Sequence, residues 1–234
     1  MNFENIICNK QNYEKFIEYL FSIKDLNYAK FHSNLTKNNN IIGIKTPILK
    51  QIAKNISKTN YIDFIELNNH KYYEEIIIHG LIITYLKDYH LAIKLFDEYI
   101  NYIESWASCD IIVCNFKIIK KNLDNSFIKI KKYLNSPNFW INRVGIVSLL
   151  TYYLNDDYID EVLKISDNIN SNEYYVKMAN AWLISICLIK YYDKTYNFLL
   201  NTKIDNWTYN KALQKAIESY RIKDNDILKN MKRN

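Results

Sequence analysis

Apolar residues recur along this chain at intervals of three and four, the spacing that places side chains on one face of an α-helix. The pattern runs almost from end to end and is interrupted by short polar clusters such as 155–157 and 170–172. About a dozen helices of roughly ten to twenty residues fit between these breaks. Two helix starts are well marked, because Thr46-Pro47 and Ser136-Pro137 each combine a capping side chain with a following proline.

The scarcity of glycine and proline also favours an all-α fold. The 234 residues include three Gly and two Pro, whereas β-sandwiches and doubly wound folds need many turn glycines. Helices with short linkers and apolar surface around most of their circumference are typical of stacked antiparallel pairs. We therefore predict one domain over residues 1–234, an α-solenoid of HEAT- or armadillo-like helix pairs. A globular helical bundle is the alternative.

One predicted helix, over 103–114, carries a carboxylate on its apolar face. Asp110 falls among Ile103, Trp106 and Val113 on this face. Trp106 and Asp110 are neighbours at i,i+4. Because an unpaired buried charge costs several kcal/mol, we expect Asp110 to pair, to cap a helix or to line a ligand-binding cleft.

A guanidinium is placed in the same way in the segment 139–147. Arg143 lies at the edge of an apolar face that contains Trp140 and Val144. It is one of only three arginines in the chain, beside many lysines. A structural ion pair with Asp110 or another carboxylate is one interpretation, and contact with a ligand is the other.

The net charge of +6 is moderately basic, and a block of lysines follows the 103–114 segment. This block consists of Lys117, Lys120, Lys121, Lys129, Lys131 and Lys132. Such a block suits a polyanion such as nucleic acid. A solvated helix face in a lysine-rich chain is the alternative interpretation.

Cysteine and histidine spacings predict neither disulfides nor a metal site. The four cysteines have no C-x-x-C spacing: Cys8, Cys109, Cys114 and Cys187. Three of them lie in apolar stretches, so we expect reduced, buried thiols in a cytoplasmic protein. No two histidines are three or four residues apart, and we expect no metal and no cofactor. The most apolar run, 76–86, contains His79 and is too short to span a bilayer, so we expect no membrane association.

Several segments, taken in their order along the chain, resemble the bacterial DNA alkylation repair family, the HEAT-like alkylpurine DNA glycosylases. They are GIKTPILKQIAK at 43–54, Trp106-x-x-x-Asp110, WINRVGIVSLL from Trp140, and YYVKMANAW ending at Trp182. A fifth, YNKALQKAIESYR at 209–221, is similar to a segment of some members. The set covers most of the chain in the expected order.

The resemblance implies a C-shaped solenoid with a concave basic cleft that binds double-stranded DNA and hydrolyses the N-glycosidic bond of alkylated purines. Trp106 and Trp182 would face the damaged nucleotide, Asp110 would be the catalytic carboxylate, and Arg143 would contact the DNA backbone beside it. Trp140 belongs to the same substrate-binding set. The lysines expected at the DNA backbone are Lys45, Lys117, Lys120 and Lys121. A monomer with no obligate protein partner is expected.

These residue types suit that reaction. N3- and N7-alkylpurines are cationic, so the base leaves readily and is attracted to the face of an indole. A carboxylate stabilises the positive charge that develops on the sugar. This sequence departs from the family pattern after Trp182, where Leu183–Cys187 replaces a frequent basic residue. The alternative is therefore a catalytically silent member that serves as a HEAT-repeat scaffold for nucleic acid or protein.

Overall fold

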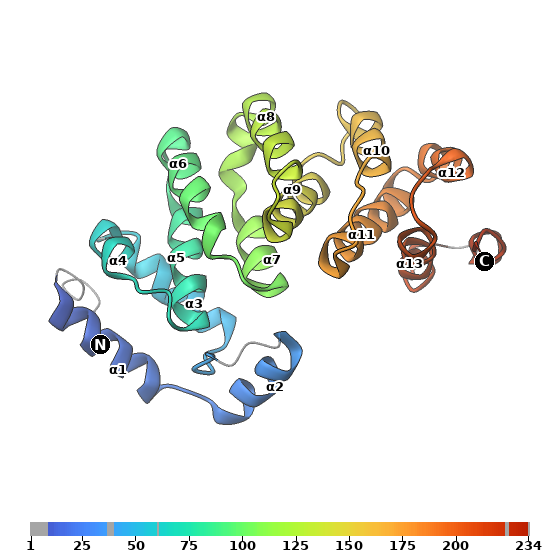
Figure 1. The fold of residues 1–234 in the computed structure, drawn as a ribbon. Coiled ribbons are helices and arrows are strands. Elements are labelled where there is room, and N and C mark those ends of the chain that lie inside the picture. Colours follow the sequence, from blue (N-terminus) through green and yellow to red (C-terminus); the bar gives the residue numbers. More distant parts are fainter. Residues whose placement is uncertain (1–8, 37–39, 60, 223–224, 234) are drawn as a thin grey trace. The chain divides into compact units, whose positions relative to one another are not determined.

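The structure is a computed structural model that describes residues 9–36, 40–59, 61–222 and 225–233. These residues form α-helices and two short 3₁₀ helices, η2 and η3, and no strand occurs among them (Figure 1). The predicted all-α class is confirmed. The helices are α1 (Lys10–Ser22), α2 (Leu26–Thr36), α3 (Thr46–Ile56), α4 (Tyr61–Leu67), α5 (Tyr73–Tyr85), α6 (Tyr89–Tyr99), η2 (Ile100–Tyr102), α7 (Trp106–Asn115), η3 (Lys117–Lys121), α8 (Leu123–Leu134), α9 (Phe139–Tyr152), α10 (Ile159–Asp167), α11 (Tyr174–Lys190), α12 (Tyr192–Asn201), α13 (Asn206–Ile217) and α14 (Asn225–Asn230).

The chain divides into two compact units, Met1–Asn122 and Leu123–Asn234. The prediction of one domain over 1–234, and that of a concave basic cleft, stay predictions.

In the first unit, α5 is the central helix. Every residue from Tyr73 to Ile83 is buried, because α3 and α7 pack on α5 and α6 and α4 also contact it. This environment explains why the segment is apolar all round rather than amphipathic. Alternate helices α3, α5 and α7 therefore form one packed layer, and α6 belongs to a second.

The second unit repeats this arrangement. Helices α9, α11 and α13 pack side by side, α8 covers α9, and α10 and α12 cover α11 (Figure 1). The α11–α13 contact encloses an apolar cluster that includes Ile184, Leu188 and Leu213. Stacked helix pairs with alternate helices in one layer are the architecture of an α-solenoid, so this prediction is confirmed. Within each unit we call the helices of this central layer the inner helices, which are α3, α5 and α7 in the first unit and α9, α11 and α13 in the second.

Both of the predicted helix starts are displaced. The N-cap of α3 is Lys45 rather than Thr46, and its side chain forms no capping hydrogen bond. The N-cap of α9 is Asn138, whose Oδ1 accepts from Trp140 N at 2.8 Å. Ser136 instead accepts from Asn138 N at 3.2 Å in the preceding turn. Serine and asparagine both cap well, and the asparagine nearer the helix does so here.

Two buried carboxylates fix the start of α5. Glu74 accepts hydrogen bonds from the N–H groups of Ile42, Gly43 and Ile44 at 2.9, 2.8 and 3.1 Å. Gly43 has a φ of 104°, and a Cβ there would lie 2.4 Å from the main-chain oxygen of Asp25. Glu75 accepts from Tyr72 N at 2.7 Å. The linker before α3 is thus held to α5 by a carboxylate at a helix N-terminus, where negative charge is favoured.

The expectation that the cysteines in apolar stretches are buried holds only in part. Cys109 and Cys187 are buried, and burial raises the pKa of the Cys187 thiol to about 12. Cys114 is exposed, so the expectation of a buried thiol is wrong there. Cys8 lies outside the described residues. Among those residues, no helix is long and apolar enough to cross a bilayer.

Candidate nucleic-acid interface

Trp106 and Asp110 lie on the partly exposed side of α7. Both are half-buried and Cys114, one further turn along, is exposed, whereas Cys109 and Ile112 are buried. The expectation that Asp110 lies within the buried stripe is therefore wrong. Gly80 explains the difference, because its missing side chain lets α5 approach Ile112, whose side chain would lie 2.6 Å from a Cβ at that position.

The first turn of α7 is held by a reciprocal cap. Ser105 Oγ accepts from Ser108 N at 3.1 Å, and Ser108 Oγ accepts from Ser105 N at 3.2 Å. Such a capping box fixes the direction in which a helix begins. Trp106 is the first residue of this helix and Asp110 follows one turn later, so the cap orients both side chains.

The other end of α7 contributes a polar cluster that was not among the site residues expected from the sequence. Lys50 Nζ in α3 donates to Asn115 Oδ1 at 3.3 Å, and Tyr85 Oη in α5 donates to the Lys50 oxygen at 3.2 Å. All three residues are partly exposed. A cation and two neutral polar groups from three inner helices therefore meet on one surface of the first unit.

Arg143 in α9 is turned inward, as predicted. Its side chain is 4% exposed, and Nη1 donates to the main-chain oxygen of Tyr175 at 2.8 Å. The same turn of α9 carries Trp140, whose ring lies 4.7 Å from that of Tyr175. Arg143 and Trp140 together hold the first turn of α11 against α9.

A row of aromatic rings runs along the starts of three inner helices. The Tyr174 ring lies 5.3 Å from Tyr175 and 5.6 Å from Trp207, the second residue of α13. The Phe139 ring lies beyond Trp140, with a centroid distance of 4.8 Å between the two. Neither Trp207 nor the two tyrosines were among the site residues expected from the sequence. The missed signal is an aromatic residue within the first two positions of successive helices.

Lys177 is bound within this row. Its Nζ lies 5.3 Å from the centroid of the Trp207 ring and 2.8 Å from Asp205 Oδ1. Asp205 also caps α13 by accepting from Thr208 N at 3.1 Å. These contacts lower the pKa of the Asp205 carboxyl against the opposing effect of its burial. The ammonium is therefore fixed beside an aromatic face rather than free in solvent.

Trp182 lies further along α11. It is partly exposed and comes seven residues after Tyr175, two helical turns, so the two share a face. Ile186, one turn beyond Trp182, is also partly exposed. The position one turn after Trp182 is thus accessible but apolar.

The lysines expected to contact the DNA backbone lie on the protein surface. Lys117, Lys120 and Lys121 are exposed in η3, and Lys121 Nζ donates to the Lys87 oxygen at 2.7 Å. Lys45 forms an exposed ion pair with Asp25 at 3.5 Å. A solvated lysine face and a phosphate-binding face are both compatible with this exposure.

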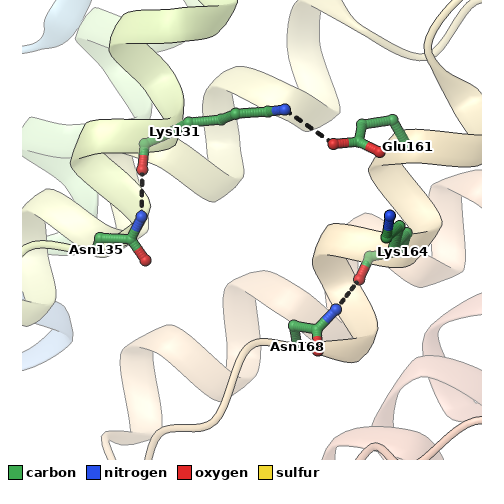
Figure 2. A network of polar contacts seen from close by, with 5 residues as sticks. All are labelled: Lys131, Asn135, Glu161, Lys164 and Asn168. Carbon is green, nitrogen blue, oxygen red and sulfur yellow. Dashed lines mark hydrogen bonds and ion pairs between the residues drawn. The ribbon is translucent and has the colours of Figure 1, made fainter.

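Lys131 differs from these lysines because it bridges two helices. Figure 2 shows its Nζ bonded to Glu161 of α10 at 2.8 Å. It also lies 4.7 Å from the Phe127 ring centroid. A pocket of about 420 Å³ adjoins this bridge, with Asn135 and Asn168 on its wall. Both amides donate to main-chain oxygens of their own helices, at 3.0 and 2.7 Å (Figure 2).

Two histidines meet in the first unit although they are nine residues apart. His70 Nε2 and His79 Nδ1 are 2.8 Å apart, and the His70 ring stacks on Tyr102 at 3.6 Å. Burial lowers the pKa of His70 to about 4, and burial together with His70 lowers that of His79 to about 3. The part of the chain that the structure describes holds no group of three or more potential metal-binding side chains.

The sequence profile of a family described as DNA alkylation repair enzyme matches residues 17–219. The matched region begins in α1 and ends just after α13, so it covers most of both units and includes Trp106, Asp110, Arg143 and Trp182. No curated protein sequence matches the chain.

Proposed function

Because this chain belongs to the DNA alkylation repair enzyme family, we propose that it hydrolyses the N-glycosidic bond of cationic N3- and N7-alkylpurines in duplex DNA. The pairing of Trp106 with Asp110 carries the proposal. The two side chains lie one turn apart on the partly exposed side of α7, and a serine capping box orients the turn between them. An indole and a carboxylate are the two groups that a cationic base and a developing sugar cation require.

In the proposed reaction the bond between C1′ and N9 of the alkylated purine breaks, and its electron pair moves to the base. The base leaves as a neutral molecule because it carried a positive charge beforehand. Positive charge develops on the deoxyribose, where the Asp110 carboxylate stabilises it. Water then adds to C1′ and loses a proton, which gives an abasic site without strand cleavage.

The remaining residues have binding roles in this proposal. Trp106 and Trp182 contact the damaged nucleotide, since both are partly exposed. Trp140 belongs to the same substrate-binding set. Arg143 acts first as a positioning residue in the free protein, because its guanidinium is 4% exposed and bonded to Tyr175. Its contact with phosphate stays a prediction.

Phosphate binding by the lysines is the least specific part of the proposal. Lys45, Lys117, Lys120 and Lys121 are exposed and can neutralise phosphates without reading sequence. We propose that the protein binds duplex DNA as a monomer through such contacts. Binding of this kind weakens steeply as salt is added.

The experiment measures release of free methylated base from alkylated duplex DNA by the wild type and by Asp110→Asn. The substitution keeps the side-chain shape and removes the charge, so release is expected to fall by about 100-fold or more. The melting temperature is expected to change little, because Asp110 is partly exposed. Asp63→Asn in α4, also a partly exposed aspartate, is the matched control and is expected to keep full activity.

A fully active Asp110→Asn protein would overturn the catalytic role of this carboxylate. A wild type that releases no base but still binds DNA would overturn the hydrolysis proposal and support the alternative of a catalytically silent scaffold.

A further inference from the structure

Three successive inner helices of the second unit share one sequence register. Each has an aromatic residue at its first or second position and a basic residue three or four residues later. The pairs are Trp140 and Arg143 in α9, Tyr174 and Lys177 in α11, and Trp207 and Lys211 in α13. Residues at these spacings lie on one side of a helix. The same spacing occurs in α7 between Trp106 and Asp110, where a carboxylate replaces the basic residue.

The structure joins the three helix starts through their rings. From Trp140 the contacts run through Tyr175 and Tyr174 to Trp207, with centroid distances of 4.7, 5.3 and 5.6 Å. Separations of this size are those of interacting aromatic pairs. We call these four residues the aromatic row.

The far end of the aromatic row is open to solvent. Tyr174 is 55% exposed and Trp207 is 37% exposed, whereas Tyr209, two residues further along α13, is 3% exposed. Neighbouring exposed aromatic rings form an apolar surface of the kind that marks interaction sites. The ring contacts hold Tyr174 and Trp207 in place, so little side-chain entropy remains to be lost on binding.

The charges along the row suit a polyanion more than an apolar partner. Lys177 is held over the Trp207 ring, and Lys211 lies one turn after Trp207 and donates to Gln214. Helices α9, α11 and α13 all begin here, and helix N-termini favour negative charge. Of the two carboxylates at these starts, Asp205 is paired with Lys177, and Glu173 is exposed.

We propose that the aromatic row is a stacking platform for unpaired nucleotides of a DNA strand. Bases would stack on Tyr174 and Trp207, and Lys177 and Lys211, each one turn behind, would face the phosphates. Alternation of aromatic and basic side chains is the general solution for binding single strands without reading sequence. The role goes beyond base excision, because stacking of unpaired bases needs neither Asp110 nor an alkylated purine.

The test compares two labelled oligonucleotides by fluorescence anisotropy. One is a single-stranded oligothymidylate, and the other is a chain of the same length with abasic sites in place of bases, so that phosphates are matched. The wild type is expected to bind the first at least about tenfold more tightly, since stacking adds to the phosphate contacts. The double variant Tyr174→Ala, Trp207→Ala is expected to lose this preference. Its binding of the abasic chain is expected to stay the same.

Two further variants keep the result interpretable. Tyr174→Phe with Trp207→Phe retains ring faces and is expected to keep most of the preference. Tyr220→Ala removes an 89% exposed tyrosine outside the row and is expected to change nothing. Equal binding of both oligonucleotides by the wild type, or an unchanged preference in the double alanine variant, would overturn the platform. Base release by Asp110 is measured separately, so either proposal can fail alone.

Discussion

Arg143 donates a hydrogen bond from Nη1 to the main-chain oxygen of Tyr175 at 2.8 Å. The acceptor lies in the first turn of α11, next to Tyr174 and two residues before Lys177. A buried guanidinium in α9 thereby fixes the backbone that carries the exposed part of the aromatic row. Packing in the inner layer and accessibility at the candidate interface thus depend on the same contact.

Arg143→Met is expected to lower the free energy of unfolding by about 1 to 3 kcal/mol, because a main-chain oxygen loses its charged donor in a buried site. Arg143→Lys should restore only part of this loss, since one ammonium cannot reproduce the planar guanidinium. Urea denaturation followed by circular dichroism provides the measurement. Stability equal to wild type in Arg143→Met would show that this bond contributes nothing to the fold.

The sequence predicted the helical class and the inward position of Arg143, because helical periodicity and a charge within an apolar stripe are local patterns. It predicted the wrong side of α7 for Asp110. Periodicity identifies the faces of a helix, but the face that is buried depends on a partner. Here the partner is α5, whose Gly80 admits Ile112.

Contacts between distant residues could not be predicted at all. The aromatic row joins Trp140, Tyr175 and Trp207, which are 35 and 32 residues apart in sequence. His70 and His79 meet only because their segment turns at His70, which has a φ of 52°. Neither arrangement follows from composition or spacing.

Glu74→Gln is expected to destabilise the protein by about 1 to 3 kcal/mol. The carboxylate accepts from three main-chain N–H groups, whereas a glutamine amide has one oxygen and turns a donor toward them. Glu66→Gln, an exposed position in α4, is the control with little expected change. Matching urea midpoints for Glu74→Gln and wild type would contradict the anchoring role.

The ion pair between Lys131 and Glu161 is expected to contribute only about 0.2 to 1 kcal/mol, because both side chains are open to solvent, with exposed fractions of 46% and 38%. A double-mutant cycle of Lys131→Ala and Glu161→Ala measures the coupling. Added salt should reduce it further. A coupling above this range would mean that the bridge between α8 and α10 is structurally important.

The contact between His70 and His79 predicts that stability depends on pH. Their folded pKa values of about 4 and about 3 lie below the ordinary histidine value of about 6.5. Between these values the unfolded chain binds more protons than the folded protein. The stabilisation is therefore fully present above pH 6.5 and is lost as the pH falls through the range toward 4.

His79→Gln is expected to remove part of this dependence, since glutamine cannot be protonated there. His79 is 2% exposed and by itself is expected to contribute about 2 kcal/mol to the stability that the wild type loses between pH 7 and pH 5. The measurement is the free energy of unfolding at both pH values for the wild type, His79→Gln and the exposed control His90→Gln. His32, whose pKa is also lowered by burial, is present in all three proteins and cancels in the comparison. If His79→Gln loses as much stability on acidification as the wild type, the buried pair is not the origin of the pH dependence.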